Sequence, residues 1–379
     1  MGFDFFGTKR KKEKLFLVLD IGTEAVKALV CRKDNGKIAI LGAATQYFER
    51  YGVFNGKIFE VNIIKKSILK AIEQVESQGQ NLKKLPVLLT LSPNILKART
   101  SLQSFRRDGG LKTKISKTQE KAIFQQILKK AQEEIHQRFK KKSGILPRDI
   151  EMISLRILEM KIDGYPVSKL QGYNGKNLEF RVLATFLLKH YLESIKRIFA
   201  DLELKILKIV HLAESLPFAF FDEEVSDKIG NSIFFDVGGE ISQIFLVKRG
   251  NLEEINEFGA GGKVFSEKLS QALGIDEESA RIFKEKYANN FLSREVEQRV
   301  KEILLSEKQT WRQDLELKLG KEKLSNVQLF GGASLLPEIK ELLPGSKIIY
   351  PKVFKNIKDE TKSLKSPQYI PSLLTCYYG

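Results

Sequence analysis

Residues Leu15–Cys31 read Leu-Phe-Leu-Val-Leu-Asp-Ile-Gly-Thr-Glu-Ala-Val-Lys-Ala-Leu-Val-Cys. Two apolar runs, rich in branched side chains, flank the short polar break Asp20-Ile21-Gly22-Thr23-Glu24. A buried run, a turn and a second buried run are typical of a β-hairpin in a protein core. The pattern therefore predicts a hairpin whose first strand ends on the carboxylate of Asp20.

The same pattern returns at Ile233–Val247, which reads Ile-Phe-Phe-Asp-Val-Gly-Gly-Glu-Ile-Ser-Gln-Ile-Phe-Leu-Val. Three residues of the break recur at the same spacing, since Asp236, Gly238 and Glu240 stand where Asp20, Gly22 and Glu24 stand in the first copy. Two copies of one hairpin, each at the start of one half of the chain, predict a duplicated fold with a cleft between the halves.

A pair of such turns has a definite chemistry. A glycine-containing turn exposes backbone N–H groups to an anion, and glycine lets phosphate oxygens approach the backbone closely. A carboxylate in each turn can hold a hydrated Mg²⁺ against phosphate. Two facing turns would therefore grip a nucleoside triphosphate. Each Asp-x-Gly taken alone is more often an ordinary tight hairpin turn than a phosphate site, so the prediction depends on the repetition.

A third motif, Leu329-Phe330-Gly331-Gly332-Ala333-Ser334-Leu335-Leu336-Pro337, places a glycine pair after an apolar run. With the two hairpins before it, the chain resembles the actin-fold ATPase superfamily from about residue 15 to residue 379. Within it, the chain looks like the bacterial division protein FtsA and its relative PilM of type IV pilus assembly. The resemblance implies an α/β fold of duplicated actin/ribonuclease H-like domains that flank a nucleotide cleft, with an inserted strand–helix–strand–strand subdomain.

The resemblance also implies ATP and Mg²⁺ as cofactors and gives roles to single residues. Asp20 and Asp236 would hold Mg²⁺ through water. The residues implied to bind the nucleotide are Asp20, Gly22, Thr23, Lys27, Asp236, Gly238, Gly239, Gly261, Gly262, Lys284, Gly331, Gly332 and Ala333. Gly22, Thr23, Gly238 and Gly239 would cradle the phosphates, and Lys284 with residues 331–333 would face the adenosine. From the residues alone, the turn 258–263 is equally compatible with an anion site or a simple change of direction.

Three departures from the family pattern bear on catalysis. Glu240 and Ile241 follow the glycine pair of the second hairpin, where family members often have Gly and then Thr. Gln243 stands where FtsA has an Asp, and Arg281 stands where the family often has a Glu. Losing a base that activates water hurts hydrolysis more than binding, because the base acts in the transition state. We expect slow hydrolysis at most, with Glu240 as a weak candidate base.

The order of the predicted elements gives a domain organisation. The predicted parts are an aromatic and basic arm (1–14), a first actin-like domain in two pieces (15–84 and 190–229), the inserted subdomain (85–189), a second actin-like domain (230–355) with a helical subdomain (263–326), and a return to the first domain (356–379).

Composition constrains the environment. The chain has 379 residues and a formal net charge of +17, which favours an anionic partner unless the lysines only solvate helix faces. No apolar run is long enough to span a membrane and no secretory signal is apparent. Cys31 and Cys376 read as buried free thiols, and the three histidines read as structural. We expect a cytoplasmic protein on the inner face of the membrane, which it could contact through residues 1–14.

The function that follows is an ATP-binding scaffold. Similarity to FtsA implies that it tethers a tubulin-like division filament to the membrane, through the helical subdomain, and associates with itself into polymers or dimers. The alternative is a PilM-like platform whose partner is a short peptide of an inner-membrane protein. A small-molecule kinase is disfavoured because no catalytic Asp stands in a sugar-sized site. The sequence has no nucleic-acid motif, so we expect no nucleic-acid partner.

Overall fold

The computed structural model describes residues 14–49, 53–54, 57–58, 61–76, 82, 84–108, 113–220, 230–320 and 326–379. The predicted arm 1–14 lies outside these residues except for Lys14, which begins the first strand. None of the helices in these ranges combines the length and hydrophobicity needed to cross a bilayer. Three sheets organise the described chain, and a short hairpin of β4 (Val53–Phe54) and β5 (Lys57–Ile58) stands apart from them.

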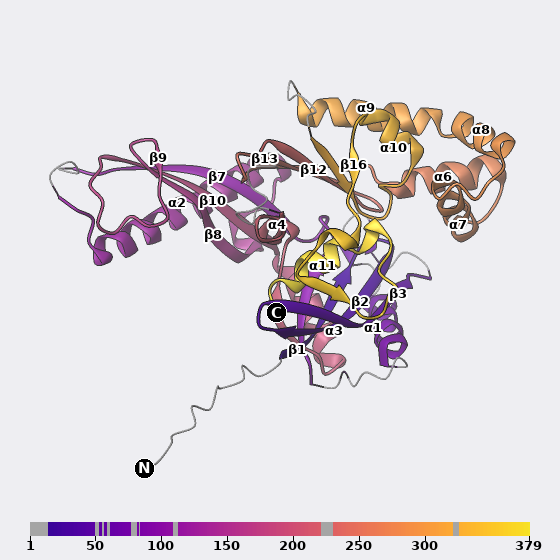
Figure 1. Cartoon of the computed structure of the whole chain (residues 1–379), viewed down its shortest axis with the longest axis horizontal. Coiled ribbons are helices and arrows are strands. Elements are labelled where there is room, and N and C mark those ends of the chain that lie inside the picture. The colour runs from indigo at the N-terminus through magenta and orange to yellow at the C-terminus, as the bar shows by residue number, and fades with distance from the viewer. Residues whose placement is uncertain are drawn as a thin grey trace, which may run out of the picture.

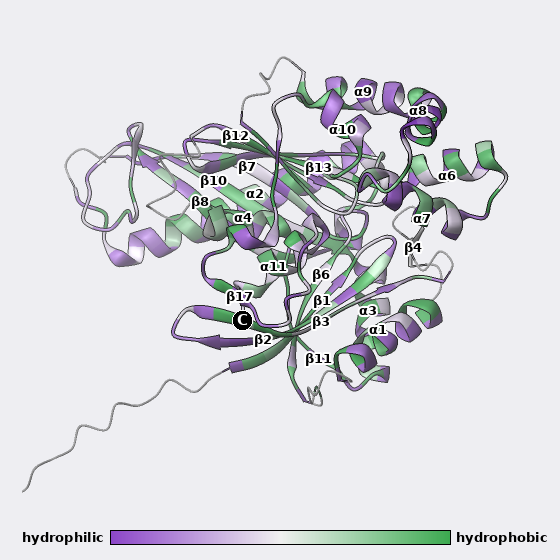
Figure 2. Cartoon of the chain, turned by 45° about the vertical axis from the view of Figure 1, so that its right-hand side comes forward, coloured by the Kyte–Doolittle hydropathy of each residue, from purple (hydrophilic) through white to green (hydrophobic). Residues whose placement is uncertain are grey.

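The first sheet contains the first predicted hairpin at its centre. Its strands, in spatial order, are β11 (Lys205–Ile209), β6 (Pro86–Leu91), β1 (Lys14–Ile21), β2 (Ala25–Asp34), β3 (Lys37–Tyr47) and β17 (Ile357–Asp359). Helices α1 (Val61–Glu76) and α3 (Lys189–Asp201) pack on one face. Both helices are amphipathic and bury apolar side chains against the sheet. Figure 2 shows hydrophobic and hydrophilic residues side by side along α1.

The second sheet repeats this plan. Its order is β14 (Asn251–Phe258), β13 (Ser242–Lys248), β12 (Ser232–Val237), β15 (Val327–Phe330) and β16 (Lys347–Ile348). In both sheets the hairpin is antiparallel, and the strand that ends on the Asp has a parallel neighbour on its other side. The two repeated sequences thus form hairpins with the same strand topology.

Helices cover one face of the second sheet and lie at the upper right of Figure 1. They are α6 (Gly262–Leu273), α7 (Glu277–Ala288), α8 (Arg294–Ile303), α9 (Leu305–Leu319) and α10 (Pro337–Leu342). Helix α8 ends at Ile303 and α9 begins at Leu305, with Leu304 between them. Trp311 of α9 is fully buried against Phe258.

Two helices, α4 (Leu212–Phe220) and α11 (Ile370–Cys376), lie between the first and second sheets. They belong to a core that contains side chains of both sheets. Cys31 of β2 and Cys376 of α11 are free and buried there, with their sulfur atoms 3.4 Å apart. The two halves thus share an apolar core. The turns of the two hairpins lie outside this core and line the cleft.

The inserted subdomain projects to the left in Figure 1. Its sheet has the order β7 (Lys97–Arg106), β10 (Asn177–Leu188), β8 (Ile150–Ile162) and β9 (Tyr165–Pro166), with helix α2 (Lys117–Ser143) packed on it. Ser116 begins α2 with a capping box to Gln119, and Gly144 ends it in the left-handed region. The short 3₁₀ helices are η1 (Pro147–Asp149), η2 (Pro351–Val353) and η3 (Pro367–Tyr369).

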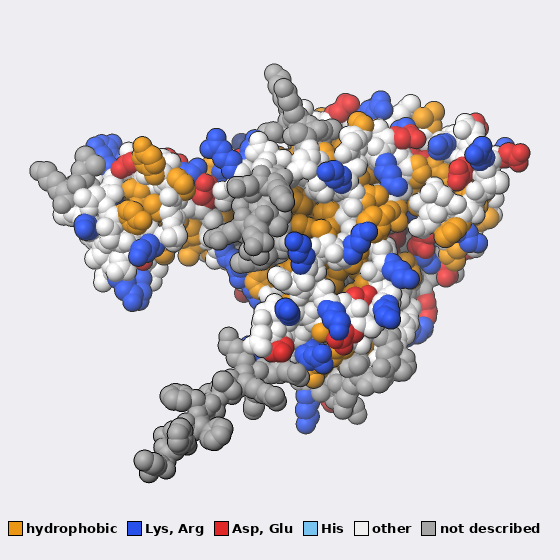
Figure 3. All heavy atoms as spheres, viewed as in Figure 1, with side chains coloured by type: hydrophobic (Ala, Val, Ile, Leu, Met, Phe, Trp, Pro, Cys, Tyr) orange, Lys and Arg blue, Asp and Glu red, His pale blue; other side chains and the backbone are white. Residues whose placement is uncertain are grey.

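The domain boundaries given above stay predictions. Lys and Arg side chains are spread over the face seen in Figure 3 and do not gather into one patch there. On this face the charge therefore agrees with lysines that solvate the surface.

Candidate functional site

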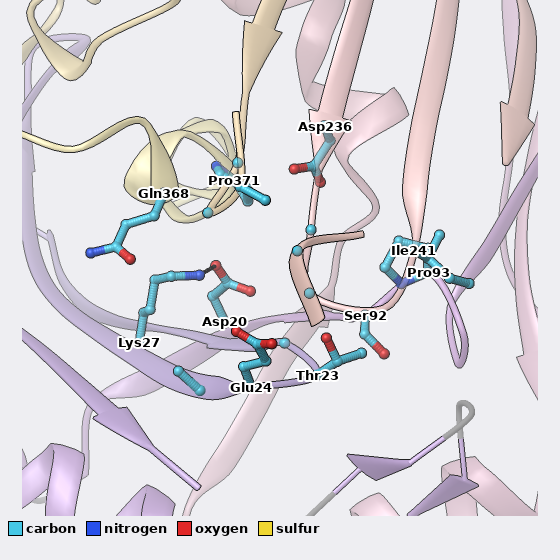
Figure 4. Close-up of a pocket in the computed structure, with 18 of the residues that line it drawn as sticks. Asp20, Thr23, Glu24, Lys27, Ser92, Pro93, Asp236, Ile241, Gln368 and Pro371 are labelled. Atoms are coloured by element: carbon cyan, nitrogen blue, oxygen red, sulfur yellow. Dashed lines mark hydrogen bonds and ion pairs between the residues drawn. The ribbon is translucent and has the colours of Figure 1, made fainter. Parts of the chain in front are cut away.

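The two hairpins bring Asp20 and Asp236 to one cavity. Asp20 lies at the end of β1 and Asp236 at the end of β12, and both side chains line the cavity between the two halves. Figure 4 shows them on opposite sides of this space. The two aspartates therefore lie at one shared cavity and not at two separate places in the fold.

The two carboxylates have different neighbours. Lys27 is opposite Asp20 in the β1–β2 ladder, and its Nζ is 3.1 Å from Asp20 Oδ2. Ser372 of α11 donates a second hydrogen bond to the same oxygen at 2.8 Å. Asp20 therefore has a cation and a hydroxyl as partners, and Figure 4 shows Lys27 pointing to it.

Asp236 has an uncharged side chain in the equivalent place. Gln243 is opposite it in the β12–β13 ladder, as Lys27 is opposite Asp20. Burial and, to a lesser extent, the nearby Asp20 raise the pKa of Asp236 to about 7, against the opposing effect of Lys27. The second hairpin thus holds a carboxyl group that titrates near neutral pH.

The orientation of Gln243 is set by His211. Nδ1 of His211 accepts a hydrogen bond from the Ala213 amide at 3.0 Å. Burial lowers the pKa of this ring to about 3, so the imidazole is neutral and carries its proton on Nε2. The Gln243 carboxamide lies 3.3 Å from Nε2 and must turn its carbonyl oxygen to that proton. The NH₂ group of Gln243 then occupies the other amide position, which is buried and has no hydrogen-bond partner among the described residues.

Many amides that we expected to face phosphate are bonded within the protein. Gly22 donates to the Ala25 carbonyl, Gly238 to that of Ile241, and Gly262 to that of Gly238. The amides of Thr23, Gly239 and Gly332 make no backbone hydrogen bond within the described chain. An anion would therefore meet a smaller set of donors than the sequence predicts.

The two turns touch one another across the cleft. The Glu240 amide donates to Thr23 Oγ1 at 3.2 Å. The Glu240 carboxylate accepts from Lys263 at 3.2 Å and from Asn94 at 2.9 Å. Glu240 does not line the cavity and lies instead at the contact between the halves.

The side of the cleft expected to face adenosine is also bridged. Lys284 is buried and its Nζ donates to the Gly262 carbonyl at 2.9 Å. Arg281 lies over the Tyr47 ring, 3.8 Å from its centroid, and pairs with Glu285 at 2.8 Å. The Tyr47 hydroxyl, on β3, donates to Glu285 at 3.3 Å. Arg281 therefore joins the two halves in this conformation.

The resulting cavity measures about 120 Å³. Sites for ligands of nucleotide size measure about 300–1,000 Å³. A nucleoside triphosphate therefore requires the two turns to separate. The structure shows a closed conformation of the cleft.

The structure places nearly all of the residues predicted to bind the nucleotide around this cavity. Gly261 is the exception, because it packs under the second turn, where a Cβ would lie 2.5 Å from the Gly238 carbonyl oxygen. Three residues that were not predicted also belong to the site: His211 and Tyr47 line the cavity, and Ser372 donates a hydrogen bond to Asp20. Lys27 and Gln243 follow their aspartates at the same spacing, and this signal could have predicted that each lies opposite its aspartate in the hairpin.

Gly331 offers a prediction with a matched control. Its φ is +95°, and a Cβ there would overlap Asp236 Oδ1 and lie 2.6 Å from the Val237 carbonyl oxygen. Gly331→Ala should lower the free energy of unfolding by about 2–3 kcal/mol, because both the backbone and Asp236 must move. Gly332→Ala should cost little, since a Cβ there meets nothing within 4 Å. Urea unfolding of both variants tests this, and equal losses would contradict it.

No protein-family model matches the chain, and no curated protein matches it in sequence. Among solved structures, it is similar to a PilM–PilN type IV pilus biogenesis complex, at 15% sequence identity and a TM-score of 0.69 over 96% of this chain and 98% of that chain. The chain has an actin-like ATPase fold.

Two further solved structures with lower TM-scores are similar to this actin-like chain. One is the ethanolamine utilization protein EutJ from Carboxydothermus hydrogenoformans, with 12% identity and a TM-score of 0.49 over 98% of this chain and 92% of that one. The other is MreB5 of Spiroplasma citri bound to AMPPNP, with 11% identity and a TM-score of 0.46 over 88% and 91%.

Proposed function

We propose that the protein is a scaffold that binds ATP with Mg²⁺ in the cleft between its halves and changes conformation with occupancy. The observation that carries this proposal is that Asp20 and Asp236, at equivalent positions of two hairpins, line one cavity. No group of three or more His, Cys, Asp or Glu side chains among the described residues could hold a metal ion. Mg²⁺ would therefore be held through water between these two carboxylates and the phosphates.

The residues around the cavity favour binding over rapid hydrolysis. Gln243 replaces a carboxylate, Arg281 replaces a glutamate, and Glu240 is bonded to Lys263 and Asn94. Of the carboxylates that line the cavity, Asp20 is bonded to Lys27 and Glu285 is paired with Arg281. ATP would act chiefly by holding the two halves in a defined relation, with slow turnover at most.

Calorimetry with ATP and Mg²⁺ tests the proposal. Wild-type protein should bind, and Asp20→Ala should bind about 10–100-fold more weakly, because a charged group that orders the metal is lost. Asp149→Ala removes an exposed carboxylate on η1 and should bind as the wild type does. An absence of heat in all three proteins would overturn the nucleotide proposal and leave a scaffold without nucleotide.

For the partner, we propose a short extended peptide from an inner-membrane protein, as for a PilM-like platform. The similar solved structure is a PilM–PilN complex. Strand β8 supports a peptide partner: within the described residues it pairs with β10 along its length, but with β9 only at Lys161 and Ile162. The rest of that edge presents backbone groups to which an extended peptide can add as a strand.

The second candidate is a division scaffold, in which the helical subdomain receives the tail of a tubulin-like filament protein. Exposed apolar side chains favour a partner there, since Phe291 is 77% exposed and Leu317 is 80% exposed. Peripheral attachment to the cytoplasmic face of the membrane belongs to either proposal. Co-sedimentation with a division filament, compared with retention on an immobilised pilus inner-membrane peptide, distinguishes the two.

A further inference from the structure

The inserted subdomain is bonded to the half of the protein to which it does not belong in sequence. It follows β6 of the first sheet and returns into α3, so both connections are to the first half. Yet β7 and β10 contact β14 of the second sheet. We define these bonded residues as the inter-domain brace: Lys97, Arg99, Thr100, Arg181, Glu253 and Glu257.

The centre of the brace is an ion cluster that water barely reaches. Glu257 Oε1 is 2.8 Å from Lys97 Nζ and 2.9 Å from an Arg99 guanidinium nitrogen. The Glu257 side chain is 13% exposed. Burial opposes its charge, but Arg99 and Lys97 lower its pKa to about 2, so the cluster is ionised. Such a cluster resists separation, because parting it leaves buried charges without partners.

A second set of bonds extends the brace along β14. The Thr100 hydroxyl donates to the Glu253 carbonyl oxygen at 2.8 Å, and Arg181 lies 3.2 Å from the Glu253 carboxylate. Thr100 and Arg181 come from neighbouring strands of the inserted sheet. The contact therefore joins the edge strand β7 and its inner neighbour β10 to β14, the edge strand of the second sheet.

The brace is in register with the cleft. Glu257 is opposite Gln243 in the β13–β14 ladder, and Gln243 is opposite Asp236 in the β12–β13 ladder. Residues directly opposite each other project from the same face of a sheet. One row of polar side chains therefore leads from Asp236 in the cleft to the ion cluster at the inserted subdomain.

We propose that the inter-domain brace restrains separation of the two halves, so that the inserted subdomain controls access to the cleft. Any movement that separates Thr23 from Glu240 turns the second sheet, and β14 with it, relative to the first. Strand β7 stays with the first half through its chain connections. The ion cluster must then lengthen or break, and a partner that moves the inserted subdomain changes how readily the cleft opens. As a control of nucleotide entry, this inference rests on the proposed function.

Amide hydrogen exchange without nucleotide tests the restraint itself. Glu257→Gln keeps the side-chain shape and removes the charge, and Thr100→Val is a milder variant that removes one bond to Glu253. Both should speed exchange at residues 22–24 and 238–241, by about tenfold in Glu257→Gln and less in Thr100→Val. The control is Glu134→Gln, because Glu134 bonds only Ser101, Gln103 and Arg138 within the inserted subdomain in the described structure. It should leave these peptides unchanged.

The same variants then separate this inference from the proposed function. Binding of ATP with Mg²⁺, followed by stopped flow, should be faster in Thr100→Val than in Glu134→Gln, because opening precedes binding. Faster exchange in the brace variants without any binding of ATP would support the restraint by the brace and overturn the proposal that the cleft binds a nucleotide. Exchange in the turns that equals that of the control in both brace variants would overturn the brace, whatever the protein binds.

Discussion

Replacing Asp236 by asparagine is expected to stabilise the protein at pH 8 and to have little effect near pH 4. The reason is the environment of the carboxyl group, which is buried, close to Asp20 and opposite the uncharged Gln243. These features raise its pKa to about 7 from an ordinary value of 3.8. The folded state therefore keeps a proton on Asp236 that the unfolded chain has already lost.

The sign follows from proton linkage. Below pH 4 both states are protonated and Asp236 has no effect on stability. As the pH rises from about 4 to about 7 only the unfolded state ionises, so stability falls, and above pH 7 the full penalty remains. A pKa of about 7 in place of 3.8 corresponds to a penalty of about 4 kcal/mol, and asparagine recovers most of it because it cannot ionise.

Urea unfolding of wild type and Asp236→Asn at pH 5, 6, 7 and 8 measures this effect. The difference in the free energy of unfolding between the two proteins should grow with pH and level off above pH 7. Asp20→Asn serves as the comparison, because it removes the partner of Lys27 and should destabilise. Parallel curves for wild type and Asp236→Asn would show that Asp236 is ionised throughout this range.

The halves of the fold were predictable because each begins with a hairpin that carries its own signal. The apolar runs around Asp20 and Asp236 are buried on both faces, so their pattern survives without knowledge of their neighbours. Helix α2 was predictable for a similar reason, since Ser116 and Gln119 cap it locally. Hairpins and helix caps of this kind depend on residues that are close in the sequence, so the sequence alone predicts them.

The closed state of the cleft was not predictable, because it depends on pairs that are distant in the chain. Ser372 reaches Asp20 across 352 positions, and Tyr47 reaches Glu285 across 238. His211 has no special spacing, and only the fold places it against Gln243. No periodicity connects such residues, so the sequence could indicate which groups surround the cleft but not that they bridge it.

Glu257→Gln should be among the most destabilising single changes in the protein. Lys97 and Arg99 would remain in place with side chains that are 17% and 18% exposed and no carboxylate between them. Breaking a buried ion pair from one side costs about 3–5 kcal/mol. Glu134→Gln removes a partner of Arg138, whose side chain is 58% exposed, and should cost less than about 1 kcal/mol.

The pH dependence and a rescue identify the cause of this loss. The pKa of Glu257 is lowered to about 2, so its contribution is complete above the unfolded pKa near 4.5 and disappears as the pH falls through 2. The gap between wild type and Glu257→Gln should therefore be constant from pH 8 to pH 5 and narrow at pH 3. In a Lys97→Met, Arg99→Met background the same change should cost much less, because no buried cation is left unpaired. An equal cost in both backgrounds would mean that the glutamate stabilises β14 by packing and that the ion cluster does not hold the inserted subdomain to the second half.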